Sequence, residues 1–199
     1  MSDNKKTAGM VRISYGDKNI LIARDQCRGS IYINPSEYAE SGNDFIRFTS
    51  LYGKEHILVA DLNRFVAGTL GWPVQEDSKL ALVLRTDSLS PYLKRQIVQY
   101  IESCNRKRQG KKAAETDTKG KADTGGLSKK IIGFRINMDT EMIHMDLSEL
   151  KLFPDVLRGG LKQRGFLALS FGCKRKIQYL LDVERILACE IAEHGESNG

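Results

Sequence analysis

FIRFTSLYGKEHILVADLNRFVAGTL (Phe45–Leu70) aligns without a gap on FLALSFGCKRKIQYLLDVERILACEI (Phe166–Ile191), although the two stretches lie far apart in the chain. Each reads as two apolar-alternating strands followed by a helix with an apolar stripe. Asp61 and Asp182 stand at equivalent positions just before the two helices. A carboxylate there accepts hydrogen bonds from the first free backbone N–H groups of a helix. The agreement of element order and cap residues predicts an internal duplication.

The alignment continues upstream, where SIYINPSE corresponds to MIHMDLSE. The second copy carries nine extra residues around KLFPDVLRGGLKQRG. One further strand precedes each of these hairpins, so each copy is predicted to form four strands followed by a helix. The expected fold class is therefore α+β, with two repeats of a four-stranded antiparallel sheet plus a helix.

Two additions flank the first copy. MVRISYG predicts an extra strand before it, and KLALVLRTD (Lys79–Asp87) predicts another after it. A helix over 90–108 follows, with Ser90 as its cap and Pro91 in its first turn. The sequence Gly71-Trp72-Pro73 is expected to end the helix of the first copy.

The middle of the chain is strongly basic. Between Asn105 and Lys130 there are nine Lys or Arg and three Asp or Glu residues. Removing these from the totals of 31 basic and 25 acidic residues leaves 22 of each, so the net charge of +6 belongs to this segment. Its low apolar content predicts a flexible linker.

These observations predict the following division of the chain: 1–10 flexible N-terminus, 11–72 first repeat, 73–107 additional strand and helix, 108–129 basic linker, 130–194 second repeat, and 195–199 flexible tail.

The four cysteines are scattered without a CxxC pair, which argues against a disulfide framework or a zinc finger. The first ten residues lack the apolar stretch of a secretory signal, and no run approaches the ~20 apolar residues of a membrane span. We therefore expect an intracellular protein, in cytoplasm or nucleus, that does not associate with membranes.

The stretch RDQCRGSIYINPSEY (Arg24–Tyr38) resembles the central hairpin of the positive-cofactor-four family of transcriptional coactivators. The resemblance is carried by Arg24, Asp25, Arg28, Gly29, Ile31, Ile33, Glu37 and Tyr38. The doubled four-strand-and-helix unit is similar to the Whirly and purine-rich-element-binding (PUR) proteins. The resemblance implies a pseudodimer that binds single-stranded DNA or RNA, without catalytic residues.

A curved sheet that exposes cationic and aromatic side chains stacks bases and follows phosphates. The candidate nucleic-acid contacts are Arg24, Arg28, Tyr32, Arg47, Lys54, Arg135, His144, Lys174, Arg175, Lys176 and Tyr179, and candidate linker contacts to phosphate are Arg106, Lys107, Arg108, Lys111 and Lys112. Tyr179 aligns with Leu58, so a core position is an equal alternative for it.

No enzyme signature is present. The three histidines are widely separated, none has a metal-ligand partner at suitable spacing, and there is no phosphate loop or dinucleotide fingerprint. We therefore expect no catalytic residue, no metal and no cofactor.

The sequence thus favours a non-enzymatic single-strand nucleic-acid-binding protein of transcription, replication or RNA metabolism. A homodimer or higher oligomer is compatible with this prediction. The alternative is a protein-binding adaptor or assembly subunit with the same fold, whose partner surface is the 90–108 helix. The balanced charge outside the linker favours this alternative.

Overall fold

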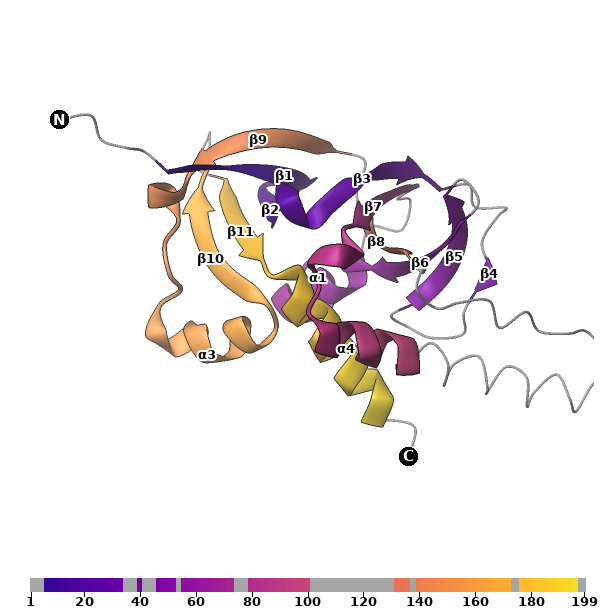
Figure 1. The fold of residues 1–199 in the computed structure, drawn as a ribbon. Helices are drawn as coiled ribbons and strands as arrows, with labels where there is room; N and C mark the ends of the chain where they lie inside the picture. Colours follow the sequence, from indigo (N-terminus) through magenta and orange to yellow (C-terminus); the bar gives the residue numbers. More distant parts are fainter. Residues whose placement is uncertain are drawn as a thin grey trace, which may run out of the picture.

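The computed structural model describes residues 6–33, 39–40, 46–52, 55–73, 79–100, 131–136, 139–172 and 176–196. These residues form two β-sheets and a group of helices (Figure 1). The elements are β1 (Thr7–Tyr15), β2 (Lys18–Ala23), η1 (Arg24–Gln26), β3 (Cys27–Tyr32), β4 (Ala39–Glu40), β5 (Ile46–Tyr52), β6 (Glu55–Asp61), α1 (Leu62–Leu70), β7 (Leu80–Leu84), η3 (Thr86–Ser88), a helix at 91–100, β8 (Ile131–Ile136), β9 (Thr140–Asp146), η5 (Leu147–Glu149), α3 (Asp155–Gln163), β10 (Phe166–Phe171), β11 (Ile177–Leu181) and α4 (Val183–Glu196).

The strand order is β10-β11-β2-β1-β9 in one sheet, called sheet 1 below, and β3-β7-β8-β6-β5-β4 in the other, sheet 2. Sheet 1 lies on the left of Figure 1 and sheet 2 on the right. Lys151, which follows β9, forms a bridge with Leu169 of β10, so the two ends of sheet 1 approach each other as in a small barrel.

The two repeats exchange their first strands. β2 begins the first copy but pairs in parallel with β11 of the second, and β8 begins the second copy but pairs in parallel with β6 of the first. The outer pairings follow the same symmetry, since β1 is antiparallel to β9 and β7 is antiparallel to β3. The predicted duplication therefore describes the order of the elements, but neither repeat forms a sheet of its own.

The predicted α+β class and the repeated order of elements are confirmed, but the prediction that each repeat is a four-stranded antiparallel sheet plus a helix is wrong for this reason. Both exchanged strands are buried on both faces: Asn19, Ile20, Leu21 and Ile22 of β2 are all buried, as are the consecutive residues Ile132, Gly133 and Phe134 of β8. A strand that is apolar on both faces is typical of the interior of a sheet with parallel neighbours. β1 also begins at Thr7, inside the segment predicted as a flexible terminus.

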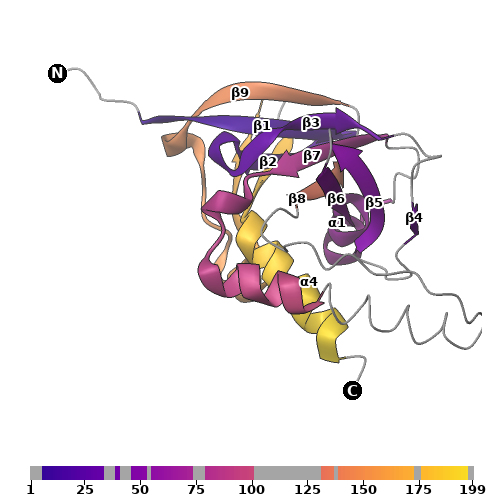
Figure 2. The same ribbon diagram turned by 45° about the vertical axis from the view of Figure 1, so that its right-hand side comes forward.

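One hydrophobic core joins the two sheets. It contains Ile13 and Ile20 from sheet 1, Phe134 from sheet 2, and side chains from α1, α4 and the helix at 91–100. Phe65 of α1 stacks on Phe166 of β10, with ring centroids 6.0 Å apart. Figure 2 shows α4 and the helix at 91–100 crossing beneath the sheets. Smaller clusters occupy the opposite faces, so each sheet buries side chains on both sides.

The predicted helix starts are confirmed. Asp61 accepts a hydrogen bond from the backbone N–H of Arg64, and Asp182 accepts one from that of Arg185. Gly71 ends α1 in the left-handed conformation with φ of 67°, as glycine at this position allows. Ser90 likewise accepts from the backbone N–H of Leu93.

A buried polar cluster lies between the sheets. Tyr15 of β1 donates a hydrogen bond to the side chain of Asn63, and Arg135 of β8 lies 3.6 Å from the carboxylate of Asp61. Asp61 is 3% exposed. Burial, and then the nearby charge of Asp61, raises the pKa of Tyr15 well above its usual range. The cluster connects β1 of sheet 1 with β6 and β8 of sheet 2 and with α1.

We predict that Asp61→Ala lowers the free energy of unfolding by about 2–4 kcal/mol, because it removes a helix cap and the buried partner of Arg135. Asp182→Ala is the matched control, since Asp182 caps the equivalent helix from a more exposed position. Its expected cost is about 1 kcal/mol. Urea denaturation of both variants measures the difference, and equal losses would contradict a role for the buried ion pair.

Candidate functional site

A groove of about 780 Å³ lies where the end of sheet 1 meets the end of sheet 2. β9 and β3, the terminal strands of the two sheets, contribute to its walls together with β1 and β7. Between β2 and β3 the chain crosses from sheet 1 to sheet 2, and η1, which makes this crossing, forms one wall. We call this feature the inter-sheet groove. It exists because the two repeats exchange strands.

The floor of the inter-sheet groove is apolar. Val11 and Leu82 are buried side chains of the common core, and Met142 of β9 is 65% exposed. Gly9 allows close packing, because a Cβ at this position would lie 3.2 Å from Cδ of Arg24. The stem of Arg24 therefore covers the backbone of β1.

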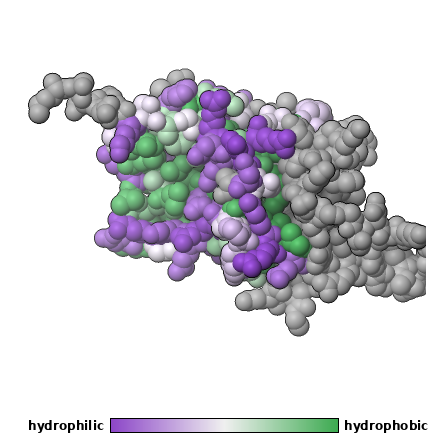
Figure 3. Space-filling view, viewed as in Figure 1, coloured by the Kyte–Doolittle hydropathy of each residue, from purple (hydrophilic) through white to green (hydrophobic). Residues whose placement is uncertain are grey.

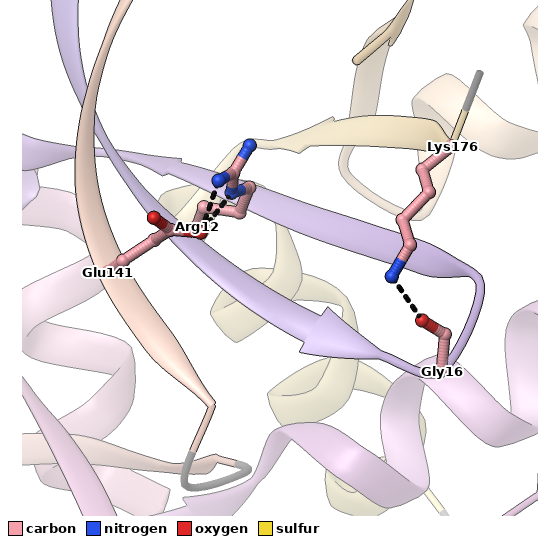
Figure 4. Close-up of polar contacts among 4 residues, drawn as sticks. All are labelled: Arg12, Gly16, Glu141 and Lys176. Carbon is pink, nitrogen blue, oxygen red and sulfur yellow. Dashed lines mark hydrogen bonds and ion pairs between the residues drawn. The ribbon is translucent and has the colours of Figure 1, made fainter. Parts of the chain in front are cut away.

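The rim of the inter-sheet groove is charged. Its lining includes Arg24, Asp25, Arg28, Arg85, Glu141 and His144. Glu141 pairs with Arg12 of the neighbouring strand, whose Nε lies 2.7 Å from the carboxylate oxygen (Figure 4). The ion pair ties β1 to β9 beside the groove.

A smaller hollow of about 380 Å³ adjoins the groove and shares Cys27, Arg28 and Arg85 with it. Leu84, Thr86 and Asp87 complete its lining. Cys27 is half-buried, and its thiol donates to the carbonyl of Ala23 at 3.6 Å. Burial, followed by the charge of Asp25, raises the pKa of Cys27 to about 12.

A second surface of interest lies on the other side of sheet 1. The exposed apolar side chains at α3 and β10, called the α3–β10 surface, are Leu152 (69% exposed), Val156 (94%), Leu157 (54%), Leu167 (37%) and Phe171 (62%). Figure 3 shows hydrophobic residues gathered on the left of this face of the molecule, where Figure 1 places β10 and α3. Monomeric proteins seldom leave such a cluster in water without a binding role.

The local sequence explains why α3 presents this surface. Leu161 packs on the core and Phe153 is buried beside Tyr179, which anchors both ends of the segment. Gly165, with φ of 85°, turns the chain from α3 into β10 so closely that a Cβ there would lie 2.7 Å from Ile186 of α4. Val156 and Leu157 are then directed away from the core.

Three of the residues predicted to contact nucleic acid come together. Arg24, Arg28 and His144 all line the inter-sheet groove and are exposed. Tyr32 is also exposed, at 62%, but lies at the end of β3 outside the set of groove-lining residues.

Other predicted contacts serve the structure. Arg135 is 16% exposed and pairs with Asp61. Lys176 donates to the carbonyl of Gly16 at 2.8 Å, joining the β10–β11 and β1–β2 hairpins (Figure 4). Tyr179 packs among Trp72, Phe153 and Phe166 with ring centroids 5.5–6.2 Å apart, so the core alternative for this residue is the correct one.

The remaining candidates are not described at side-chain level. Arg47 belongs to β5, of which only the backbone is described. Outside the described residues lie Lys54, Lys174, Arg175 and the linker residues Arg106, Lys107, Arg108, Lys111 and Lys112.

The helix predicted as a partner surface faces inward over its described part, 91–100. Leu93, Ile97 and Tyr100 are buried in the common core, and the backbone N–H of Ser90 donates to Glu184 of α4 at 2.9 Å. Tyr92 is the large apolar side chain that this part of the helix exposes.

Two features of the described residues bear on function class. No three His, Cys, Asp or Glu side chains among them gather as they would around a metal ion. None of the helices in the described ranges is long and apolar enough to cross a membrane.

Comparison with known proteins finds a solved structure with a similar fold. No protein-family model matches the chain, and no curated protein matches it in sequence. Among solved structures, the chain is similar to the scaffolding protein TtCheW from Thermoanaerobacter tengcongensis, with a TM-score of 0.55 and 10% sequence identity. The match covers 94% of this chain and 91% of that chain. It therefore shows a likeness of the whole fold.

This likeness corrects the resemblance to positive-cofactor-four, Whirly and PUR proteins and the prediction of a single-stranded DNA- or RNA-binding protein. The structural neighbour is a scaffolding protein, and its fold accounts for nearly the entire chain. Burial accounts for part of the error: Arg135 is paired with Asp61 and Tyr179 packs against the core, so these two side chains do not form an exposed face for bases.

We predict that Cys27 reacts with iodoacetamide at neutral pH roughly 30-fold or more slowly in the folded chain than in the denatured one. A raised pKa lowers the thiolate fraction more than it raises intrinsic nucleophilicity. Mass spectrometry of the Cys27 peptide measures the rate. Asp25→Asn removes the second cause of the shift and should accelerate the reaction, whereas equal rates in folded and denatured protein would contradict the described environment.

Proposed function

We propose that this chain is a non-enzymatic scaffold that binds partner proteins, with the α3–β10 surface and the inter-sheet groove as its docking sites. The observation that carries the proposal is the exposure of Leu152, Val156, Leu157 and Phe171 on one side of sheet 1. The fold likeness to a scaffolding protein supports it, as does the even balance of charges outside the basic segment 105–130.

The energetics favour a partner on the α3–β10 surface. Burying apolar surface contributes roughly 25 cal/mol per Å², and a fully covered Val, Leu or Phe side chain contributes about 1.5–3 kcal/mol. A cluster of such side chains at the centre of an interface supplies the contacts that usually dominate binding.

The charges around the α3–β10 surface indicate which kind of partner fits. Lys151 and Lys162 are exposed around it, and the carboxylate of Asp155 lies 3.0 Å from Arg158. A second copy of this chain would bring an identical cationic rim against the first, which is unfavourable in a two-fold interface. The fitting occupant is a different protein with an apolar patch and an acidic rim.

The inter-sheet groove supplies the second site. It is long enough to involve four strands and combines an apolar floor with a charged rim, the composition expected of a surface that receives a polypeptide segment. A scaffold needs two such separate surfaces in order to hold two partners at once.

Site-specific photo-crosslinking tests the α3–β10 surface. Benzoylphenylalanine replaces Val156 in the full-length chain, in cells that naturally express it, and replaces Arg95 of the helix at 91–100 in a matched control. We expect one discrete protein adduct at position 156 and none at position 95. Leu157→Asp in the position-156 background should reduce the adduct at least tenfold, because it places a charge at the centre of the interface.

Three outcomes would overturn the assignment of this surface. The first is the absence of an adduct at position 156. The second is an adduct with a second copy of the chain, which would indicate that this surface forms a homo-oligomer and does not bind a different protein. An adduct only at position 95 would restore the helix as the partner surface. The thermal unfolding of each variant is measured to confirm that the fold is retained.

A further inference from the structure

One edge of sheet 1 is open beside the inter-sheet groove. β9 is a terminal strand of this sheet, and β1 is the described strand with which it pairs (Figure 1). The sheet closes on itself further along the chain, at Lys151, whose backbone N–H and C=O both pair with Leu169 of β10. Before this bridge, the outer edge of β9 borders the groove, because Met142 and His144 line it.

The register of β1 and β9 determines which backbone groups face this edge. In an antiparallel ladder, opposed residues alternate between pairs that exchange hydrogen bonds and pairs that do not. The backbone N–H of Leu147 donates to the carbonyl of Lys6, and the register continues without a shift, so the odd-numbered residues of β9 bond to β1. The N–H and C=O groups of Met142 and His144 therefore point away from β1.

These outward backbone groups are open. At the two ends of β9, the outward residues Thr140 and Asp146 have further interactions, whereas the described part of the chain gives Met142 and His144 no partner on this side. The edge thus offers two N–H donors and two C=O acceptors. Open backbone groups in a row are the usual template for pairing with another strand.

β9 is better suited to accept a strand than the other edge beside the groove. β3 is a terminal strand of sheet 2, but its ladder with β7 is interrupted by a bulge at Arg28. Bulges, lysines and prolines are among the devices that protect an edge from pairing. β9 contains neither lysine nor proline, and its ladder with β1 runs from Thr7 to Ile13 without a bulge.

The groove determines which side chains a pairing strand would carry. Val11 is opposite Met142, so both side chains lie on the same face of sheet 1, and both residues line the groove. Alternate side chains of a strand added to β9 would share this face and cover Val11, Leu82 and Met142, which favours apolar residues. The intervening side chains would lie on the opposite face beside the exposed Glu141, where polar residues are tolerated.

A second copy of the chain fits this edge poorly. In a two-fold antiparallel pairing of two β9 strands, both sheets keep the same face on the same side of the interface. The groove walls formed by η1 and β3 would then stand on the same side in both copies, over one shared ladder. A single extended segment of another protein brings no such walls.

We propose that β9 accepts an extended segment of a partner protein as an additional strand of sheet 1. The segment forms hydrogen bonds to the backbone of Met142 and His144 and places apolar side chains, at every second position, in the inter-sheet groove. The inference rests on the proposed scaffold function and specifies how one of its two docking sites binds. In this mode of recognition, backbone hydrogen bonds supply affinity and alternate side chains supply specificity.

Selection from a phage-displayed library of random peptides supplies the probe. The full-length chain is immobilised, and bound phage are sorted by whether they still bind the variant Met142→Asp, which places a charge on the groove floor. We expect the groove-dependent peptides to carry apolar residues at every second position, because successive side chains of a strand point to opposite faces. An amphipathic helix would instead repeat them every three or four residues.

Proline at position 144 tests the backbone contact. The N–H of His144 is not part of the β1–β9 ladder, so His144→Pro removes one donor of the open edge and keeps the fold. Synthetic groove-dependent peptides should bind this variant at least tenfold more weakly by fluorescence anisotropy, because the loss also leaves a peptide carbonyl unpaired. Circular dichroism melting checks that each variant is folded.

Two control variants separate the backbone from the side chain and β9 from β3. His144→Ala keeps the N–H and should retain binding. Tyr32→Pro removes the equivalent donor of β3, because the N–H of Ile33 donates to the carbonyl of Lys79 and that of Tyr32 therefore points away from β7. It should also retain binding. Equal losses with alanine and proline at position 144, or a loss with Tyr32→Pro alone, would overturn the assignment to the edge of β9.

Methylation of the peptide backbone provides the sharper arm, since it needs no change in the chain. Methyl groups are placed on one peptide nitrogen at a time. They should weaken binding at alternate positions only, because every second N–H of an added strand faces β9. Tolerance of methylation at every position would overturn strand addition while leaving the groove a docking site.

Two further outcomes also count against the proposal. A dimer of the chain alone that His144→Pro dissociates, measured by sedimentation equilibrium, would make the occupant of the edge a second copy. If no selected peptide depends on Met142, the groove is not a docking site and strand addition fails with it. The crosslink at position 156 then decides independently whether the chain is a scaffold.

Discussion

Two parallel strand pairings, β2 with β11 and β8 with β6, hold the structure together. Each joins a strand that begins one repeat to a strand that ends the other. Parallel neighbours require a long crossover connection, so these pairings form only when distant parts of the chain meet. The common core, the polar cluster at Asp61 and the inter-sheet groove all depend on this exchange, because each is built from both repeats.

Local features of the fold could be predicted from the sequence, since the residues that cause them lie within a few positions. The caps at Asp61 and Asp182, the helix end at Gly71 and the helix start at Ser90 are of this kind. The alternation of apolar and polar residues along the sequence also indicates which side chains of a strand are buried, as at Ile33 beside exposed Tyr32 and at Phe134 and Ile136 beside Arg135. Such signals identify elements but contain no information about which strands become neighbours.

The candidate site could be predicted only in fragments for the same reason. The sequence offers Arg24, Arg28 and His144 as candidate nucleic-acid contacts, and the structure brings them to one groove. The groove itself depends on β1, β3, β7 and β9, whose contributions are separated by up to about two thirds of the chain. Arg85 and Met142 carried no sequence signal of a site. Val156 and Leu157 did carry one, because they are apolar residues within the nine-residue insertion that distinguishes the second repeat.

The connection between β7 and β8 has a consequence for the covalent chain. β1 and β2 are joined by a turn at Gly16 and Asp17, whereas the equivalent antiparallel pair, β7 and β8, is joined through residues 85–130. A cut in this connection would leave two fragments that each contribute strands to both sheets. Cleavage there would not release two domains: the fragments would remain interlocked as a heterodimer, and reassembly of the separated halves would amount to folding by association.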